Sequence, residues 1–334
     1  MIATIKSIFI HTSVFEWNQA DTEVRVFNLK DVPHCPSDPT STIYFRPDHL
    51  RTQSTGIIYS FILFRKNPKA VIAEFHCTQH APGQWSSPPK APFGGITAEK
   101  GCKANELEFF LNCIKEWMAN LGGKKLTVST SAACYNPTLH PLLRQCYLST
   151  EFISTRTLIN HHILVNALKF EHSIYPSERR RLRKSEDADF QAYLCKEHSI
   201  DMIYPFLLKC AERNGYELSL SKCQLGTLLT RFPEDFLVFS VNNKGQLIAL
   251  AIMVKVTSDI LYYFLSAFDP QYRSYSPMVL LLKNVYEFCQ QNDFSILDLG
   301  TSLDRHGNNK PSLARFKKNI GGIECEKITY ELVF

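Results

Sequence analysis

The feature that most restricts how this chain can fold is an order of predicted elements that occurs twice along its 334 residues. Each half predicts a pair of strands, a loop rich in Ser and Pro, a helix of about fifteen residues, and a strand that ends in Thr-Ser, at Thr130-Ser131 and at Thr301-Ser302. A short helix then begins with X-Pro-[Thr/Ser]-Leu, at 136–139 and at 310–313. Such internal similarity predicts a duplicated structural unit. The alternative is two unrelated α/β units.

Hydrophobic periodicity assigns the individual elements. In the first half, 56–65 and 70–78 predict two strands joined by a hairpin, and 104–121 predicts an amphipathic helix that Gly122-Gly123 ends. In the second half, the apolar run 260–268 predicts a strand, and a polar loop separates it from a helix that begins at Pro277 and ends near Gln291. A second strand is predicted over 295–300 and a last helix over 312–319.

Composition bounds the class of protein. Hydrophobic residues make up 45% and charged residues 21%, which is typical of a globular protein, and the length favours two domains, predicted as 1–170 and 171–334. The net charge of +5 suits an anionic ligand but is too small to argue for nucleic acid by itself. No apolar run approaches the ~20 residues that span a bilayer. The eleven cysteines are odd in number and scattered, without a C-x-x-C pair, which predicts a reducing, cytoplasmic setting and no metal site.

Residues 178–334 resemble a GNAT-fold acyltransferase domain, and the whole chain looks like a tandem-GNAT protein of the Fem-like kind. The resemblance rests on the basic segment 179–184, on Asp269 with the loop after it, on Asp298-Leu299-Gly300 and on the segment 315–321. It implies an α+β fold of two GNAT-like domains in tandem, each a mixed, mostly antiparallel sheet flanked by helices. The first domain lacks a comparable loop before its helix, so we expect it to be degenerate and to have lost its cofactor site.

The loop before Pro277 is the predicted cofactor site. GNAT enzymes usually bind the pyrophosphate of coenzyme A through Gln/Arg-x-x-Gly-x-Gly/Ala, and the resemblance therefore implies acetyl-CoA or another acyl-CoA as the donor. This chain keeps the glutamine and the spacing but has serine at both glycine positions, which alters how closely the backbone can approach a phosphate. The alternative is a polar strand-to-helix turn. The residues concerned are Gln271, Tyr272, Arg273, Ser274, Tyr275 and Ser276.

Two carboxylates are candidate catalytic residues. Asp269 follows the strand beside which a GNAT donor lies, so it could position the attacking amine or accept its proton; the alternative is an Asp-Pro turn residue that caps the loop. Asp298 lies among apolar residues of a strand, and a carboxylate there must be paired or protonated. Its alternative role is a buried structural pair.

The resemblance adds Lys317 and Tyr330. Fem-like transferases carry a Phe-Lys pair in the last helix, here Phe316-Lys317, which implies contact with the acceptor or the reacting carbonyl; a solvated helix face is the alternative. GNAT enzymes often use a tyrosine near the end of the fold to protonate the leaving thiolate, for which Tyr330 is the candidate, with a core aromatic as the alternative. His161 and His162 alternate across a strand, so they are not expected to chelate one metal.

Three functions follow. The first is an N-acyltransferase that moves an acyl group from acyl-CoA to a small-molecule or peptide amine bound between the two domains. The second is a Fem-like transferase that uses aminoacyl-tRNA, which the basic segment 179–184 favours, although a solvated basic helix is the alternative. The third is a non-catalytic GNAT-fold binding protein, which the two serines favour.

Overall fold

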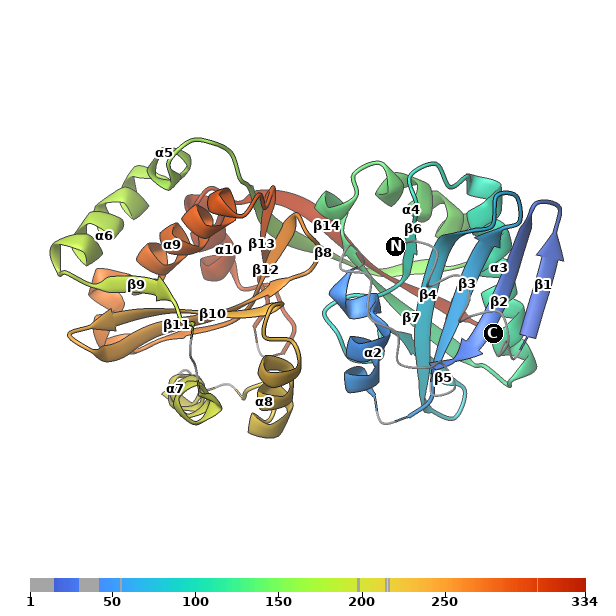
Figure 1. Cartoon of the computed structure of the whole chain (residues 1–334), viewed down its shortest axis with the longest axis horizontal. Coiled ribbons are helices and arrows are strands. Elements are labelled where there is room, and N and C mark those ends of the chain that lie inside the picture. Colours follow the sequence, from blue (N-terminus) through green and yellow to red (C-terminus); the bar gives the residue numbers. More distant parts are fainter. Residues whose placement is uncertain are drawn as a thin grey trace. The chain divides into compact units, whose positions relative to one another are not determined.

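The computed structural model describes residues 15–29, 42–54, 56–196, 199–213, 215, 217–304 and 306–334 (Figure 1). The chain forms two compact units: unit 1 comprises Met1–Leu158 with Glu326–Phe334, and unit 2 comprises Ile159–Cys325. The chain therefore passes between the units twice, within strand β8 (Ile153–Leu164) and within strand β14 (Ile323–Val333), whereas the sequence predicts one boundary near residue 170.

Unit 1 is a twisted sheet in the order β1-β2-β3-β4-β5-β7-β14, to which β6 adds by pairing with β4. Its core lies between the sheet and helices α3 and α4, where Trp85, Phe110 and Tyr147 are fully or nearly fully buried. The predicted hairpin and amphipathic helix are confirmed. The elements of this half are β1 (Phe15–Gln19), β2 (Thr22–Asn28), η2 (Ile43–Phe45), α2 (Pro47–Gln53), β3 (Ile58–Arg65), β4 (Ala70–Ala81), β5 (Gln84–Ser87), β6 (Ile96–Ala98), α3 (Ala104–Asn120), β7 (Lys125–Ala132), η3 (Ala133–Tyr135) and α4 (Leu139–Ser149).

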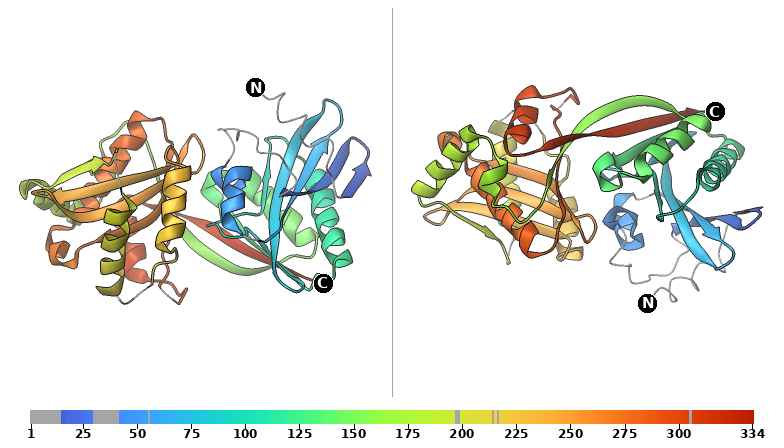
Figure 2. Two further views of the ribbon diagram at one scale, coloured as in Figure 1. Left: turned by 60° about the horizontal axis from the view of Figure 1, so that its bottom comes forward. Right: turned by 90° about the horizontal axis from the view of Figure 1, so that it is seen from above.

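Unit 2 has helices on both faces of a sheet in the order β8-β13-β12-β11-β10-β9. Helix α9 packs on β9 to β13 from one face, with α6 beside it, while α7 and α8 pack on β12 and β10 from the other (Figures 1 and 2). Helix α9 spans the predicted residues and buries most of its apolar side chains. The elements of this half are α5 (Phe170–Ser173), α6 (Pro176–Asp187), β9 (Gln191–Leu194), α7 (Ile200–Arg213), α8 (Lys222–Arg231), β10 (Phe236–Asn243), β11 (Gln246–Lys255), β12 (Ile260–Phe268), η4 (Pro270–Tyr275), α9 (Pro277–Gln291), β13 (Ile296–Thr301) and α10 (Pro311–Asn319).

The two halves exchange their last strands. Strand β8 follows the first X-Pro helix but pairs with β13 of unit 2, as in Leu297 with Ile163. Strand β14 follows the second X-Pro helix but pairs with β7 of unit 1, as in Tyr330 with Val128. Both pairings are antiparallel. In each half, the strand after the X-Pro helix pairs with the sheet of the other unit. This shared connectivity supports the predicted duplication. Among the described residues, no helix combines the length and the apolar character that a membrane span requires.

Candidate functional site

The central feature of unit 2 is the place where strands β12 and β13 separate. They pair in parallel at three positions, from Ile260 with Ile296 to Tyr262 with Asp298, and no backbone pairing joins these fully described strands beyond that point. Strand β12 continues along β11 as far as Phe268, with a bulge that leaves Phe264 unpaired. A bulge bends its strand and increases the local twist. Beyond Tyr262, the side of β12 that faces β13 has no strand partner, and we call the diverging ends of these two strands the wedge.

Asp298 lies at the apex of this wedge. It is 2% exposed, and its Oδ1 accepts hydrogen bonds from Asn160 Nδ2 at 2.7 Å and from Gly300 N at 2.8 Å. Gly300 has φ 72°, and a Cβ there would lie 3.3 Å from a ring carbon of Tyr262. Burial, and next the negative charge of Asp298, raise the pKa of Tyr262 well above its usual value. Asp298 therefore fixes the end of β13 in a shape that favours glycine.

Lys317 reaches the same place from helix α10. Its side chain is 5% exposed, so the solvated alternative is wrong. Its Nζ donates to Gly300 O at 3.0 Å and to Thr301 O at 2.6 Å. Burial lowers the pKa of Lys317 to about 8, against a smaller upward effect of the Asp298 charge. The structure thus brings two of the predicted catalytic residues into one buried cluster, whose amine loses its proton more easily than an ordinary lysine.

Asp269 belongs to a separate cluster in the same unit. It is 3% exposed, and its Oδ1 accepts from Arg213 Nη1 at 2.7 Å and from Gln271 N at 3.1 Å, while Lys209 Nζ lies 3.7 Å from its Oδ2. Asp269 therefore caps the loop and holds the end of α7 against it, which matches the capping alternative. With both carboxylate oxygens engaged, it is a positioning residue rather than a free base.

The predicted phosphate loop is not open. Residues Pro270–Tyr275 form the 3₁₀ helix η4, in which Tyr272 N donates to Asp269 O, and Ser276 N donates to Arg273 O just after it. These amides are therefore already bonded within the loop, so the expected cradle of backbone N–H groups is only partly available. Ser276, at the second glycine position, adopts φ 54° and ψ 55°, a conformation that favours glycine. Arg273 remains exposed.

Comparison with known proteins identifies this arrangement. The family described as "Acetyltransferase (GNAT) domain" matches residues 175–318. FemX aligns with 12% sequence identity and a TM-score of 0.62, covering 82% of this chain and 87% of that one. The protein has the GNAT fold, in tandem. A tandem GNAT protein from the clavulanic acid biosynthesis pathway aligns with 10% identity and a TM-score of 0.51, covering 83% of this chain and 82% of that one.

This protein is also similar to L-PGS from Bacillus licheniformis, with 8% identity and a TM-score of 0.51, covering 78% of this chain and 80% of that one. A search of curated protein sequences gives no significant match. At these identities the structural likeness establishes the fold and not the substrate.

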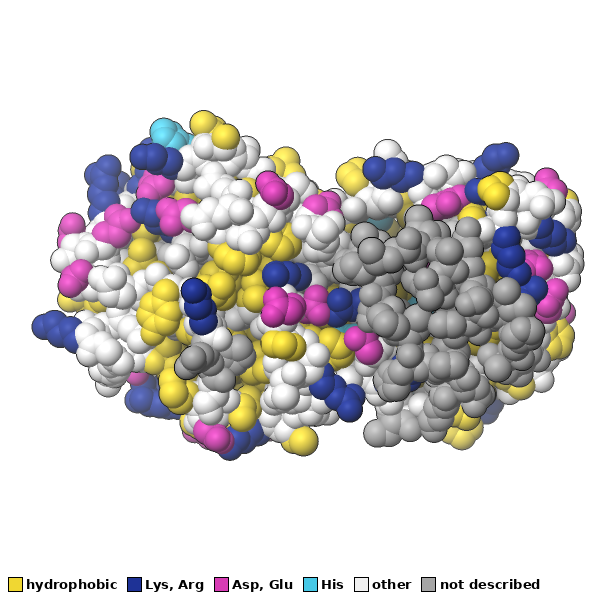
Figure 3. All heavy atoms as spheres, viewed as in Figure 1, with side chains coloured by type: hydrophobic (Ala, Val, Ile, Leu, Met, Phe, Trp, Pro, Cys, Tyr) yellow, Lys and Arg dark blue, Asp and Glu magenta, His cyan; other side chains and the backbone are white. Residues whose placement is uncertain are grey.

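The basic segment of the sequence forms helix α6 of the GNAT domain, and it contacts η4. Ser185 Oγ donates to Tyr275 O at 2.5 Å, and Lys184 Nζ lies 4.8 Å from the centre of the Tyr275 ring. Lys and Arg side chains with acidic ones between them lie along this edge (Figure 3, upper left). The sequence gives no sign of this contact, because the partners are 90 residues apart. The exposed cations of α6 are Arg179, Arg180, Arg181, Arg183 and Lys184.

Tyr330 lies in the other GNAT unit. It is 2% exposed in the core of unit 1, where its ring stacks on that of Tyr147 with centroids 4.5 Å apart. Burial raises the pKa of Tyr330 to about 12. Tyr330 is therefore an aromatic residue of the hydrophobic core, and we do not include it in the proposed site.

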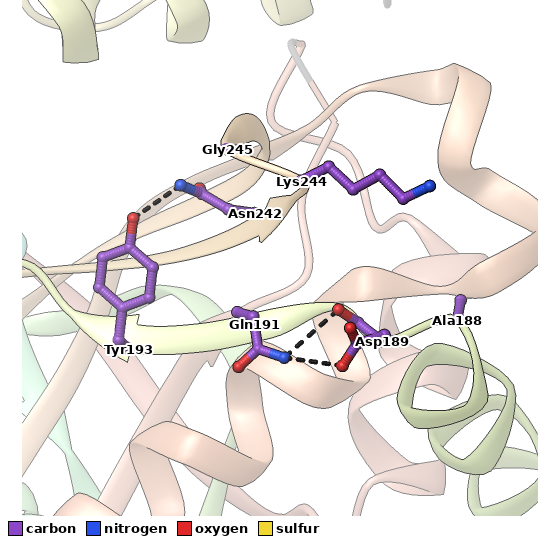
Figure 4. A pocket seen from close by; sticks show the side chains of 7 residues that line it. All are labelled: Ala188, Asp189, Gln191, Tyr193, Asn242, Lys244 and Gly245. Carbon is purple, nitrogen blue, oxygen red and sulfur yellow. Dashed lines mark hydrogen bonds between the residues drawn. The ribbon is translucent and has the colours of Figure 1, made fainter.

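A small pocket of about 270 Å³ lies elsewhere in unit 2, where the edge strand β9 meets the β10–β11 turn (Figure 4). Asn242 Nδ2 donates to Tyr193 OH at 2.7 Å, and Gln191 Nε2 donates to Asp189 Oδ1 at 3.0 Å, so these lining groups bond to one another. None of the predicted site residues lines it. The sequence prediction also missed the residues that hold the real clusters together, Asn160 and Arg213, because each acts through a partner more than fifty residues away.

Proposed function

We propose that unit 2 is an N-acyltransferase domain, in which an amine attacks the carbonyl of an acyl-CoA thioester held in the wedge between β12 and β13. The separation of these strands after Tyr262 and Asp298 is the observation that carries the proposal. Amides of β12 on the side that β13 leaves could stabilise the oxyanion as fixed donors, and the catalysis comes mainly from positioning the two reactants.

Lys317 and Asp298 supply the polar end of the proposed site. With a pKa of about 8, Lys317 is partly neutral at pH 7 to 8 and can exchange a proton with the acceptor amine. Asp298 holds Gly300 in place and keeps negative charge beside the amine. Asp269, together with Arg213, positions the loop that carries Arg273. We propose Arg273 as the contact for the phosphates of the donor, since the loop offers few free amides.

Isothermal titration calorimetry with acetyl-CoA and coenzyme A tests the proposal. We expect Arg273→Ala to weaken binding about tenfold, the loss of one charge-assisted contact. Arg231→Ala is the matched control, because it removes an exposed arginine from the end of α8 in the same unit. Absence of binding by the wild type, or equal losses in the two variants, would contradict the proposal.

The contact between α6 and η4 favours a second candidate, an aminoacyl-tRNA donor, which the Fem-like resemblance also implies. A row of exposed cations beside the donor loop suits an extended phosphate backbone better than a single pyrophosphate. Filter binding of tRNA should weaken at least tenfold when Arg179, Arg180 and Arg183 are changed together to Gln, and the salt dependence should fall. Arg181 is left intact because it bonds to Glu178. Unchanged tRNA binding with lost acetyl-CoA binding would reject this candidate.

A further inference from the structure

His161 is a buried histidine that has no part in the acyl transfer proposed above. It is 1% exposed in strand β8, and neither ring nitrogen has a hydrogen-bond partner among the described residues. A neutral imidazole carries one N–H donor and one acceptor lone pair, so two polar groups are left unsatisfied. Native structures rarely bury such groups without a functional reason.

The position of His161 links it to the Lys317 cluster. In the β8–β13 ladder, His161 is the cross-strand partner of Gly300, whose carbonyl accepts a hydrogen bond from Lys317 Nζ. His161 Nε2 also lies 3.6 Å from Glu324 Oε1, just beyond hydrogen-bond length. Glu324 is 41% exposed. His161 is therefore linked to the buried amine of Lys317 through its cross-strand partner Gly300, and its ring lies beside a carboxylate that is exposed to solvent.

The charges around His161 fit a neutral imidazole. Burial, and next the positive charge of Lys317, lower the pKa of His161; Lys318 lowers it further, whereas Glu324 and Cys325 raise it. His161 is thus held neutral at rest, with one ring nitrogen that carries a lone pair and would be protonated only transiently during proton transfer. Neutral Lys317 uses its two N–H groups on Gly300 O and Thr301 O, and its lone pair stays free for a proton.

We propose that His161 is a positioning residue that passes protons between Lys317 and Glu324. The proposal rests on the acyl-transfer function proposed above. In that reaction an N–H bond of the amine breaks as the N–C bond forms, and the leaving thiolate takes up one proton. An acceptor that enters as an ammonium releases one more proton, which must leave a buried site. That proton moves from the acceptor nitrogen to Lys317 Nζ, then through one bridging water to a ring nitrogen of His161, and from the other nitrogen to Glu324 and solvent.

Two variants on the surface test the relay without disturbing the core. Glu324→Gln and Lys318→Met both break the ion pair between Lys318 and Glu324, but only the first removes the carboxylate beside His161. In NMR titrations of the full chain with ¹⁵N-labelled histidine, we expect the pKa of His161 to fall in Glu324→Gln and to rise in Lys318→Met. Acyl transfer should slow at least tenfold in Glu324→Gln and stay within about twofold of wild type in Lys318→Met.

His161→Gln keeps a polar side chain that cannot titrate. We expect acyl transfer to slow at least tenfold, with unchanged acetyl-CoA affinity and a changed pH–rate profile. A wild-type pH–rate profile in this variant, or a His161 titration that Glu324→Gln leaves unaltered, overturns the relay. If His161→Gln fails to fold, the surface pair still decides. If the wild type transfers no acyl group at all, the proposed function fails, and the NMR titrations still show whether His161 is coupled to Glu324.

Discussion

The two units differ in how their parallel strands pair at the centre of the sheet. In unit 2, β12 leaves β13 after three paired positions. In unit 1, the corresponding strands stay together: β5 pairs with β7 in parallel along its whole length, from Gln84 with Lys125 to Ser87 with Val128. Beyond it, Gly94 N donates to Ser129 O at 2.8 Å and continues the pairing. The parallel strands therefore separate in one copy, whereas in the other copy the pairing continues past the end of β5.

The segment that closes unit 1 is tightly packed. A Cβ at Gly94 would lie 2.6 Å from Pro88 N. Gly95 N donates to Ser87 Oγ at 3.0 Å, and Ile96 N donates to Tyr147 OH at 3.2 Å. The chain itself thus satisfies groups beside β7 that a ligand would otherwise bond. This supports the expectation that the first half has lost a donor site.

Aligning the two copies by their repeated motifs shows what else changed. When Thr130-Ser131 is aligned with Thr301-Ser302, Thr127 corresponds to Asp298 and Ser129 corresponds to Gly300. When the two X-Pro helices are aligned, Leu143 corresponds to Lys317. Leu143 packs against the core of unit 1. The buried acid, the glycine and the buried amine therefore occur together in the copy whose parallel strands separate, and all three are replaced in the other copy.

The largest effect is expected from Lys317→Leu, which gives unit 2 the residue of unit 1. Acyl transfer should fall at least about a hundredfold, because a proton-transfer group is removed, while acetyl-CoA binding persists. Activity and calorimetry on the same preparation measure this. The reciprocal change Leu143→Lys should cost about 1 kcal/mol of stability and leave the activity unaltered. Equal activity losses in the two variants would contradict the proposal that acyl transfer takes place in unit 2 alone.

The pH dependence of the free energy of unfolding tests the same difference between Lys317 of unit 2 and the leucine of unit 1. Folding depresses the pKa of Lys317 from 10.5 to about 8, so between these values the unfolded chain binds more protons than the folded one. The cost of burying the ammonium is full below pH 8 and vanishes towards pH 10.5, so the free energy of unfolding of the wild type should rise with pH relative to Lys317→Leu. The total is on the order of 3 kcal/mol. Urea unfolding of both proteins at pH 7, 8.5 and 10 measures the difference, and a constant difference would contradict the buried, depressed amine.

Gly300→Ser tests the backbone of the open copy. The change introduces the residue of unit 1 at φ 72°, next to the Tyr262 ring, and should cost about 1–2 kcal/mol and weaken acetyl-CoA binding. The control is Ser129→Gly, since Ser129 has no left-handed backbone and should lose less than about 1 kcal/mol. Chemical unfolding monitored by circular dichroism gives both values. A larger loss in the control would mean that the glycine is not required by the backbone of β13.

The sequence predicted local elements well and their pairing poorly. Helix α9 and the hairpin of β3 and β4 follow from periodicity and turn residues, which act within a few positions. The exchange of β8 and β14, the contact of α6 with η4 and the burial of Lys317 depend on partners far along the chain, which no local pattern encodes. The 3₁₀ conformation of 270–275 was also missed, because a polar loop with Pro270 suits a turn and an open loop equally.

The smallest effect is expected from Ser276→Gly, at the loop that distinguishes unit 2 from its copy. The loop of unit 1 has glycines, Gly95 and Gly101, at its positive φ values, whereas the loop of unit 2 holds Ser276 at φ 54°. Glycine removes a strain of about 1 kcal/mol but adds freedom to the unfolded chain, so the net gain should be about 0.5 kcal/mol, or about 1–2 °C in Tm. Since glycine also lets a phosphate approach the backbone more closely, acetyl-CoA should bind about threefold tighter. Scanning calorimetry and titration calorimetry measure the two quantities separately. A lower Tm would instead show that the bond from Ser276 Oγ to Arg273 O, at 3.4 Å, outweighs the strain, and that the serine is part of how this loop holds its shape.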